Sequence, residues 1–263
     1  MSSQSANVDT DVDYVVCCAP RRSGSSLMHN VIVDVLATTN FSSSVQVVKA
    51  HHPTSANYLK TEGTRRRHVY VARDFRDTIV SDITLYELPN RFWRTASMSV
   101  LPESLRSYRY WRRQPHFYTT TYDALTGDLA ARALEVAEFL GAELTEEDAE
   151  EIAERHSANK VQAEVEAHYA KSPVAQQADI DSKIGFRQGH FQGGETGKWQ
   201  RVLSPWQVAF IEFHARSWLE ENGFRLSQSR PRQWLAAVAG APFMLAGWLV
   251  VRTKLALGRT QVH

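Results

Sequence analysis

The stretch CCAPRRSGSSLMHNVI, Cys17–Ile32, joins a buried strand to a helix through a short polar loop. The run that leads into it, DYVVCCAP, is short, apolar and β-branched, which is typical of a strand inside a parallel sheet. After the loop, Leu27, Val31 and Val35 recur every four residues and form one apolar helix face. Gly24 lets the backbone approach a ligand closely, and the amides at a helix start favour an anion. The stretch therefore predicts a strand, a loop with an anion site, and a helix.

The loop does not follow the rule for nucleoside-triphosphate enzymes, G-x-x-x-x-G-K-[ST]. Gly24 stands alone, and two arginines, Arg21 and Arg22, precede it. Ser25 and Ser26 add hydroxyl donors, and one of them is expected to cap the helix. By itself the loop is equally compatible with an ordinary helix cap.

Composition restricts the class of partner. The 263 residues include 30 basic and 29 acidic residues, so the chain has no global basic field for nucleic acid and any anion site must be local. Cys17 and Cys18 are adjacent in a strand and point to opposite faces, which excludes a disulfide framework. Residues 1–12 are polar and acidic, lack the pattern of a secretory signal, and are expected to form a disordered tail.

Strand patterns alternate with helix patterns along the chain. After the first strand come VQVVKAHHP, then His68–Ala72, then HFYTTTYDAL, with helical periodicity between them. This order predicts an α/β domain of three layers, with a mostly parallel central sheet covered by helices on both faces. Ligands of such sheets bind beyond the carboxyl ends of the strands. The polar groups at those ends are Arg21–Ser26, His51, His52, Arg73, Tyr122 and Asp123.

Three motifs together resemble the sulfotransferase family. The loop RSGSS resembles the family's 5′-phosphosulfate loop as it occurs in the carbohydrate branch. RDFRDTIVS has Arg73, Asp77 and Ser81 at the family spacing R-x-x-x-D-x-x-x-S, and KAHHP has Lys49 and His51 in register with K-T-H-x-P. The likeness covers roughly residues 13–224, and the order of the motifs makes it specific.

A fourth motif is looser. RQGHFQGGETGKWQR resembles the family's R-K-G-x-x-G-x-W-K through Arg187, Gly189, Lys198 and Trp199. It departs by a glutamine at the second position and by a longer middle. Leu27 stands where the cytosolic branch has a tryptophan, as in many carbohydrate-type members.

The resemblance implies a P-loop-like sulfotransferase fold and transfer of a sulfuryl group from 3′-phosphoadenosine 5′-phosphosulfate (PAPS) to a hydroxyl or amine of a small-molecule, lipid or glycan acceptor. The bisphosphate PAP would be the other product, and no metal would be required. His51 would be the general base, Lys49 would contact the sulfate, and Arg22 would neutralise the leaving phosphate, with Arg21 left open for that role. The implied donor-binding residues are Arg21, Arg22, Ser23, Gly24, Ser25, Ser26, Leu27, Arg73, Ser81, Arg187, Gly189, Lys198 and Trp199.

Two other functions stay open at this point. One is a P-loop kinase-like phosphotransferase, which the missing Gly-Lys-Ser/Thr and the missing acidic strand end disfavour. The other is a non-catalytic nucleotide-binding membrane adaptor. The aromatic and basic segment 87–115 is interpreted either as part of the acceptor wall or as surface helix packing.

The C-terminal segment 234–251 has no charged residue over eighteen positions, and Arg230 and Arg232 precede it. It predicts a hydrophobic helix that crosses a bilayer, lies in its interface, or packs on the domain. The expected organisation is a tail over 1–12, a sulfotransferase domain over 13–228 and a membrane-associated tail over 229–263. The catalytic domain is expected in the cytoplasm, anchored to the cytoplasmic face of a membrane.

Overall fold

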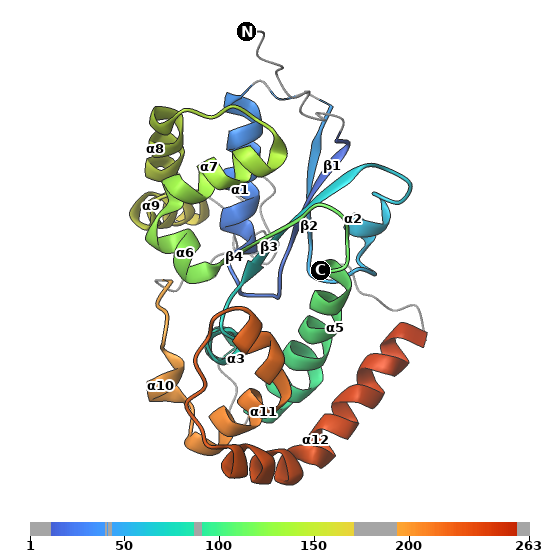
Figure 1. Ribbon diagram of the computed structural model, residues 1–263. Helices are drawn as coiled ribbons and strands as arrows, with labels where there is room; N and C mark the ends of the chain where they lie inside the picture. Colours follow the sequence, from blue (N-terminus) through green and yellow to red (C-terminus); the bar gives the residue numbers. More distant parts are fainter. Residues whose placement is uncertain (1–11, 40, 42–43, 87–90, 171–193, 257–263) are drawn as a thin grey trace, which may run out of the picture.

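The computed structural model describes residues 12–39, 41, 44–86, 91–170 and 194–256, and is shown in Figure 1. Its centre is a parallel sheet of four strands in the order β2-β1-β3-β4. Their bounds are β1 Tyr14–Cys18, β2 Gln46–Ala50, β3 Arg66–Ala72 and β4 Phe117–Thr121. The prediction of a parallel sheet is confirmed, and its two central strands, β1 and β3, are buried along most of their length.

Helices cover both faces of the sheet, which confirms the predicted three layers (Figure 1). On one face α1 packs with α7 and α8, and on the other α3, η1, α5 and α11 pack together. The bounds are α1 Ser25–Thr38, α2 Ala56–Leu59, α3 Phe75–Tyr86, α4 Arg91–Arg94, the π-helical η1 Thr95–Val100, α5 Leu101–Trp111, α6 Tyr122–Gly127, α7 Leu129–Leu140, α8 Glu146–Arg155, α9 Ala158–Ala170, α10 Trp199–Val202, α11 Pro205–Glu221 and α12 Arg230–Ala256.

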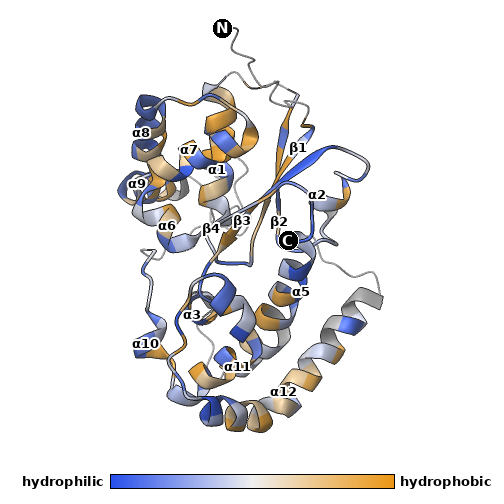
Figure 2. Ribbon diagram, in the orientation of Figure 1, coloured by the Kyte–Doolittle hydropathy of each residue, from blue (hydrophilic) through white to orange (hydrophobic). Residues whose placement is uncertain are grey.

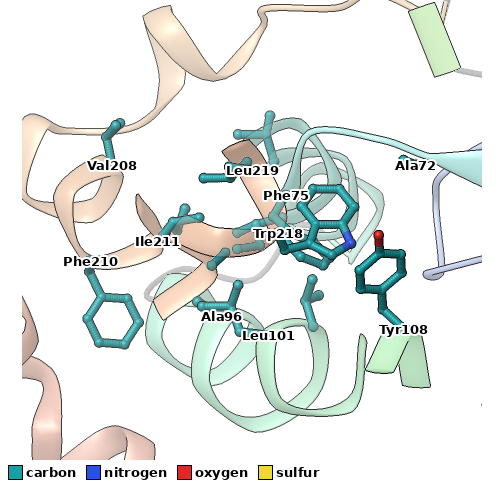
Figure 3. Close-up of a cluster of buried hydrophobic side chains, with 14 of the residues drawn as sticks. Ala72, Phe75, Ala96, Leu101, Tyr108, Val208, Phe210, Ile211, Trp218 and Leu219 are labelled. Carbon is teal, nitrogen blue, oxygen red and sulfur yellow. The ribbon is translucent and has the colours of Figure 1, made fainter. Parts of the chain in front are cut away.

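The larger core lies between the sheet and the second group of helices (Figure 3). There the rings of Phe75 on α3 and Trp218 on α11 lie 4.0 Å apart, and Tyr108 of α5 lies edge-on to Trp218. Leu101 and Trp111 are fully buried. One side of the segment 91–111 therefore belongs to the core, while Arg106 and Arg109 on α5 are exposed. This agrees with a helix packed at the surface, and a part in the acceptor wall stays a prediction.

One local prediction is wrong, and another is confirmed with a break. The helix start at Ser25 has no side-chain cap, because Gly24 holds the N-cap position with φ of 88°. The sequence pattern after Thr145 predicts a largely helical stretch, and this is confirmed by α8 and α9, which are separated at His156. His156 Nε2 lies 2.8 Å from Asp34 Oδ2, so the break brings this end of α8 onto α1.

The C-terminal prediction is met only in part. Residues 230–256 form one helix, α12, with Pro242 inside it, and Figure 2 shows its hydropathy. Within the described ranges, no helix combines the length and the apolar character that crossing a membrane requires.

Candidate active site

The loop after β1 has an unusual backbone. Gly24 has φ of 88° and Arg22 has φ of 63°, a left-handed value that is uncommon outside glycine. A Cβ at Gly24 would lie 2.6 Å from Cδ2 of Tyr122, so the ring of the residue after β4 closes the space beside the loop. The first amides of α1 have no acceptor within the helix and no side-chain cap. This leaves the start of α1 suited to an anion.

Arg22 and Arg73 are brought together by this turn. The Nε of Arg22 donates to Ser81 Oγ on α3 at 3.2 Å, and Nη1 of Arg73 donates to the Arg22 carbonyl at 2.9 Å. The Arg73 guanidinium lies 4.2 Å over the Tyr122 ring. Its Nε is buried and has no hydrogen-bond partner among the described residues. Two guanidinium groups and one hydroxyl thus share one corner of the site, and the role of Arg73 and Ser81 in binding one phosphate stays a prediction.

Lys49 and His51 occupy the end of β2, on the other side of the loop. Nζ of Lys49 donates to Ser26 Oγ at 2.9 Å, so the end of the strand reaches the helix start. Nδ1 of His51 lies 3.0 Å from the carbonyl oxygen of Ala19. Because a carbonyl only accepts, Nδ1 carries the hydrogen, and Nε2 presents its lone pair.

Burial lowers the pKa of His51 to about 4, and the charges of Lys49 and Arg21 act in the same direction. His51 is therefore neutral at neutral pH. The next residue, His52, turns its Nδ1 to Thr54 Oγ1 at 2.9 Å and lies outside this corner. The choice of His51 over His52 as the base stays a prediction.

The segment before α11 is attached to the site by Asp77 of α3. Its Oδ2 accepts from the Gly197 amide at 2.6 Å and its Oδ1 accepts from the Trp199 amide at 3.0 Å. Lys198 lies between these two bonds. Arg76, from the same helix, lies 4.1 Å from the ring centre of Trp199.

Arg76 is itself fixed by two buried carboxylates. Its Nη2 lies 2.6 Å from Asp74 Oδ2, and its Nη1 lies 2.7 Å from Glu212 Oε1. The sequence reasoning gave no role to Asp77 or Arg76. The aspartate was visible in the spacing R-x-x-x-D-x-x-x-S, but Arg76 has no signal beyond its position next to that aspartate. Arg187 and Gly189, which were also predicted for the site, lie outside the described residues.

Taken together, these features define an α/β protein with a cationic, hydroxyl-rich loop site at the carboxyl edge of its sheet. The family described as "Sulfotransferase domain" matches residues 29–223, and the chain belongs to this family and is a sulfotransferase enzyme. No curated protein matches the chain.

Solved structures of sulfotransferases share the fold. A retinol dehydratase in complex with androsterone and inactive cofactor PAP aligns with a TM-score of 0.59 at 17% identity over 81% of this chain and 82% of that one. Mouse sulfotransferase SULT7A1 complexed with PAP aligns with a TM-score of 0.58 at 15% identity over 84% and 91%. The expected sulfotransferase fold is confirmed.

Proposed function

We propose that the enzyme transfers a sulfuryl group from PAPS to the hydroxyl of a small apolar acceptor. PAPS would supply the activated sulfuryl group, and PAP would leave. One observation carries the proposal: the neutral His51 imidazole and the cationic corner of Arg22, Arg73 and Ser81 lie on opposite sides of one helix start. The base would take the proton of the acceptor hydroxyl, and the fixed positive charge would hold the phosphates of the donor.

The residues present fit a donor with phosphate groups. Arg73 has a buried Nε that lacks a partner among the described residues, and Ser81 is already bonded to Arg22. These groups would hold the 3′-phosphate. Ser25, Ser26 and the first amides of α1 would hold the 5′-phosphate, with Lys49 directed to the sulfate through its place at Ser26.

The segment at 197–199 would complete the donor site. Asp77 fixes its backbone, which places Lys198 and Trp199 beside α3. Lys198 would contact the 3′-phosphate and Trp199 the adenine. The prediction that no metal is needed stays a prediction, and arginine and lysine are the groups that would carry the charge.

His51 would take the proton of the acceptor hydroxyl at Nε2. The bond from Nδ1 to Ala19 orients the ring and fixes the tautomer. A bound anion opposes the charges of Lys49 and Arg21, so donor binding should raise the pKa of His51 above its value of about 4 in the free protein. The imidazole then becomes a better proton acceptor when the donor is in place.

The acceptor class is proposed from the relatives. Two retinol dehydratase structures hold androsterone or retinol, each together with PAP. An apolar alcohol is therefore our first choice, ahead of an amine, a lipid or a glycan. Transfer of labelled sulfate to a sterol, a fatty alcohol and a monosaccharide tests this choice, and transfer to the sugar alone would contradict it.

Calorimetry with PAP, with and without magnesium, tests the donor. Binding without metal supports the proposal, whereas binding of magnesium ATP with no response to PAP would favour a phosphotransferase. His51→Ala should abolish sulfate transfer and keep PAP affinity. PAP binding by the unaltered protein without any transfer from PAPS would favour the non-catalytic alternative.

The two loop arginines are separated by a pair of variants. Arg22 is bonded to Ser81, and the charge of Arg21 acts on His51 and His52. We therefore propose that Arg22 serves the 3′-phosphate and Arg21 the leaving group. Both Arg22→Ala and Arg21→Ala should weaken PAP binding, because PAP carries both phosphates. Only Arg21→Ala should also lower kcat at saturating PAPS, because only the 5′-phosphate gains charge as the sulfuryl group leaves. The reverse pattern would refute this assignment.

A further inference from the structure

The outward side of α12 is apolar over four turns. Its buried positions, at Gln233, Ala236, Ala237, Gly240 and Gly247, follow helical spacing and face the protein. The large side chains on the other positions are between 46% and 64% exposed: Trp234, Leu235, Val238, Phe243, Leu245, Trp248 and Leu249. No charged residue lies between Arg232 and Arg252. A helix face that meets water alone carries polar residues, so this apolar face is expected to be covered.

The packing of α12 fixes which side faces outward. Figure 1 shows the helix on the outside of the molecule beside α11 and α5. A Cβ at Gly240 would lie 2.3 Å from Cε2 of Phe210, so the helix approaches α11 at this glycine and cannot accept a side chain there. Phe243 stacks on Trp93 at 4.9 Å. The patch also extends onto α11, where Phe213 contacts the Trp234 ring edge-on.

Both ends of the apolar face are basic and aromatic. Arg230 and Arg232 are exposed before it, and Arg252 is exposed after it with its guanidinium 5.0 Å from the ring centre of Trp248. Trp234 and Trp248 lie near the two ends. Tryptophan and arginine at the ends of an apolar helix face are typical of helices that lie in the interface of a bilayer, where rings sit among headgroups and cations meet phosphates.

We propose that this face of α12 docks the enzyme on the surface of an anionic lipid bilayer, with the helix lying in the interface. The charges decide against a second copy of the chain. Because both ends are basic, pairing two α12 helices in either orientation would bring arginine beside arginine. A layer of anionic headgroups instead pairs with all three exposed arginines.

Vesicle sedimentation of the full chain tests the proposal. We expect binding to vesicles of phosphatidylcholine with phosphatidylserine, weaker binding to phosphatidylcholine alone, and loss of the difference at high salt. Leu235→Glu and Leu245→Glu, each on the outward face, should weaken binding about tenfold or more because a charge is placed in the apolar layer. Leu59→Glu, at an exposed leucine of α2, is the matched control and should bind as the unaltered protein does.

Two results would overturn the proposal. The first is an unaltered protein that does not sediment with the anionic vesicles, or face variants that sediment as well as the Leu59→Glu control. The second is a concentration-dependent dimer in analytical ultracentrifugation that Leu235→Glu abolishes, without vesicle binding, which would make the face a contact between copies. Equal melting temperatures confirm that the variants fold. PAP calorimetry on the same samples is independent of the outcome, so failure of docking is distinguishable from failure of the proposed activity.

Discussion

Replacing Asp77 should open the segment at 197–199 and weaken donor binding. Asp77 is only 4% exposed, and its two oxygens accept from the amides of Gly197 and Trp199. A hydrogen bond to a charged group contributes about 1.5–3 kcal/mol, so Asp77→Ala removes about 3–6 kcal/mol of attachment before the segment relaxes into water. Relaxation returns much of this, because the freed amides become solvated. We expect PAP affinity to fall about 10–100-fold, or ~1.4–2.8 kcal/mol.

Asp77→Asn separates positioning from simple loss of packing. The amide side chain keeps one acceptor oxygen but turns a donor NH2 toward the second backbone amide, so one bond survives and two donors face each other without an acceptor. The PAP affinity of Asp77→Asn should lie between that of the unaltered protein and that of Asp77→Ala. In steady-state kinetics the KM for PAPS should rise while kcat at saturating donor stays close to its original value.

Calorimetry with PAP and melting temperatures on the same preparations decide the outcome. The control is Arg201→Ala, which breaks an exposed ion pair between Arg201 and Glu195 in the same part of the chain and should leave PAP affinity unchanged. If Asp77→Asn binds PAP as tightly as the control, the two hydrogen bonds do not position the donor site. If kcat falls and the KM for PAPS does not change, Asp77 acts in another step.

Three substitutions and one pH profile test other parts of the geometry. Arg73→Ala should weaken PAP binding about tenfold or more in calorimetry, because it removes the guanidinium beside the Arg22 carbonyl; unchanged affinity would contradict the proposed 3′-phosphate site. Gly24 has φ of 88°, and a Cβ added there would lie 2.6 Å from the Tyr122 ring. Gly24→Ala should therefore lower the free energy of unfolding in urea titrations by about 1–3 kcal/mol, and an unchanged midpoint would show that the loop accommodates the methyl group. Because the base form of His51 is neutral, activity should be lost as pH falls through its pKa. The acidic limb of kcat/KM for PAPS should lie near pH 4, and that of kcat should lie at higher pH. Coincident limbs would refute the proposal that donor binding raises the pKa of His51. Burial lowers the pKa of His68 to about 4, so the unfolded state binds a proton before the folded state does as pH falls below about 6.5, and the folded state loses stability. His68→Phe should therefore recover up to ~2 kcal/mol of the free energy of unfolding that is lost between about pH 7 and pH 5. An unchanged pH dependence of this free energy would refute the assignment.

The sheet and the strand-end residues could be predicted because they depend on local patterns. Each strand is a short run rich in β-branched or aromatic residues, and parallel strands bring their carboxyl ends to one edge. Together these two rules are enough to place His51 and Arg73 near the loop. The pattern LAARALEVAEFLG likewise predicts a helix that ends at a glycine, and α7 ends at Gly141, whose φ of 71° suits glycine.

The segment 91–111 could not be predicted in the same way. A π-helical stretch, Thr95–Val100, interrupts the α-helical spacing between α4 and α5, so its buried side chains do not recur at a period that a sequence pattern can detect. Trp111 and Leu101 become core residues only through the cluster that α5 forms with α3 and α11, and α11 lies far away in the sequence. Arg76 was missed for a related reason, because its carboxylate partner Glu212 is 136 positions later.

The two adjacent arginines show where sequence reasoning stops. In an extended loop, the side chains of two neighbouring residues would point to opposite sides, as they do in a strand. Arg22, however, has φ of 63°, which residues other than glycine rarely adopt and which the sequence does not predict. The turn at Arg22 directs its carbonyl to Arg73 and its Nε to Ser81. We therefore assign the position that matches the family's loop lysine to the far end of the proposed donor, and we leave the leaving group to Arg21.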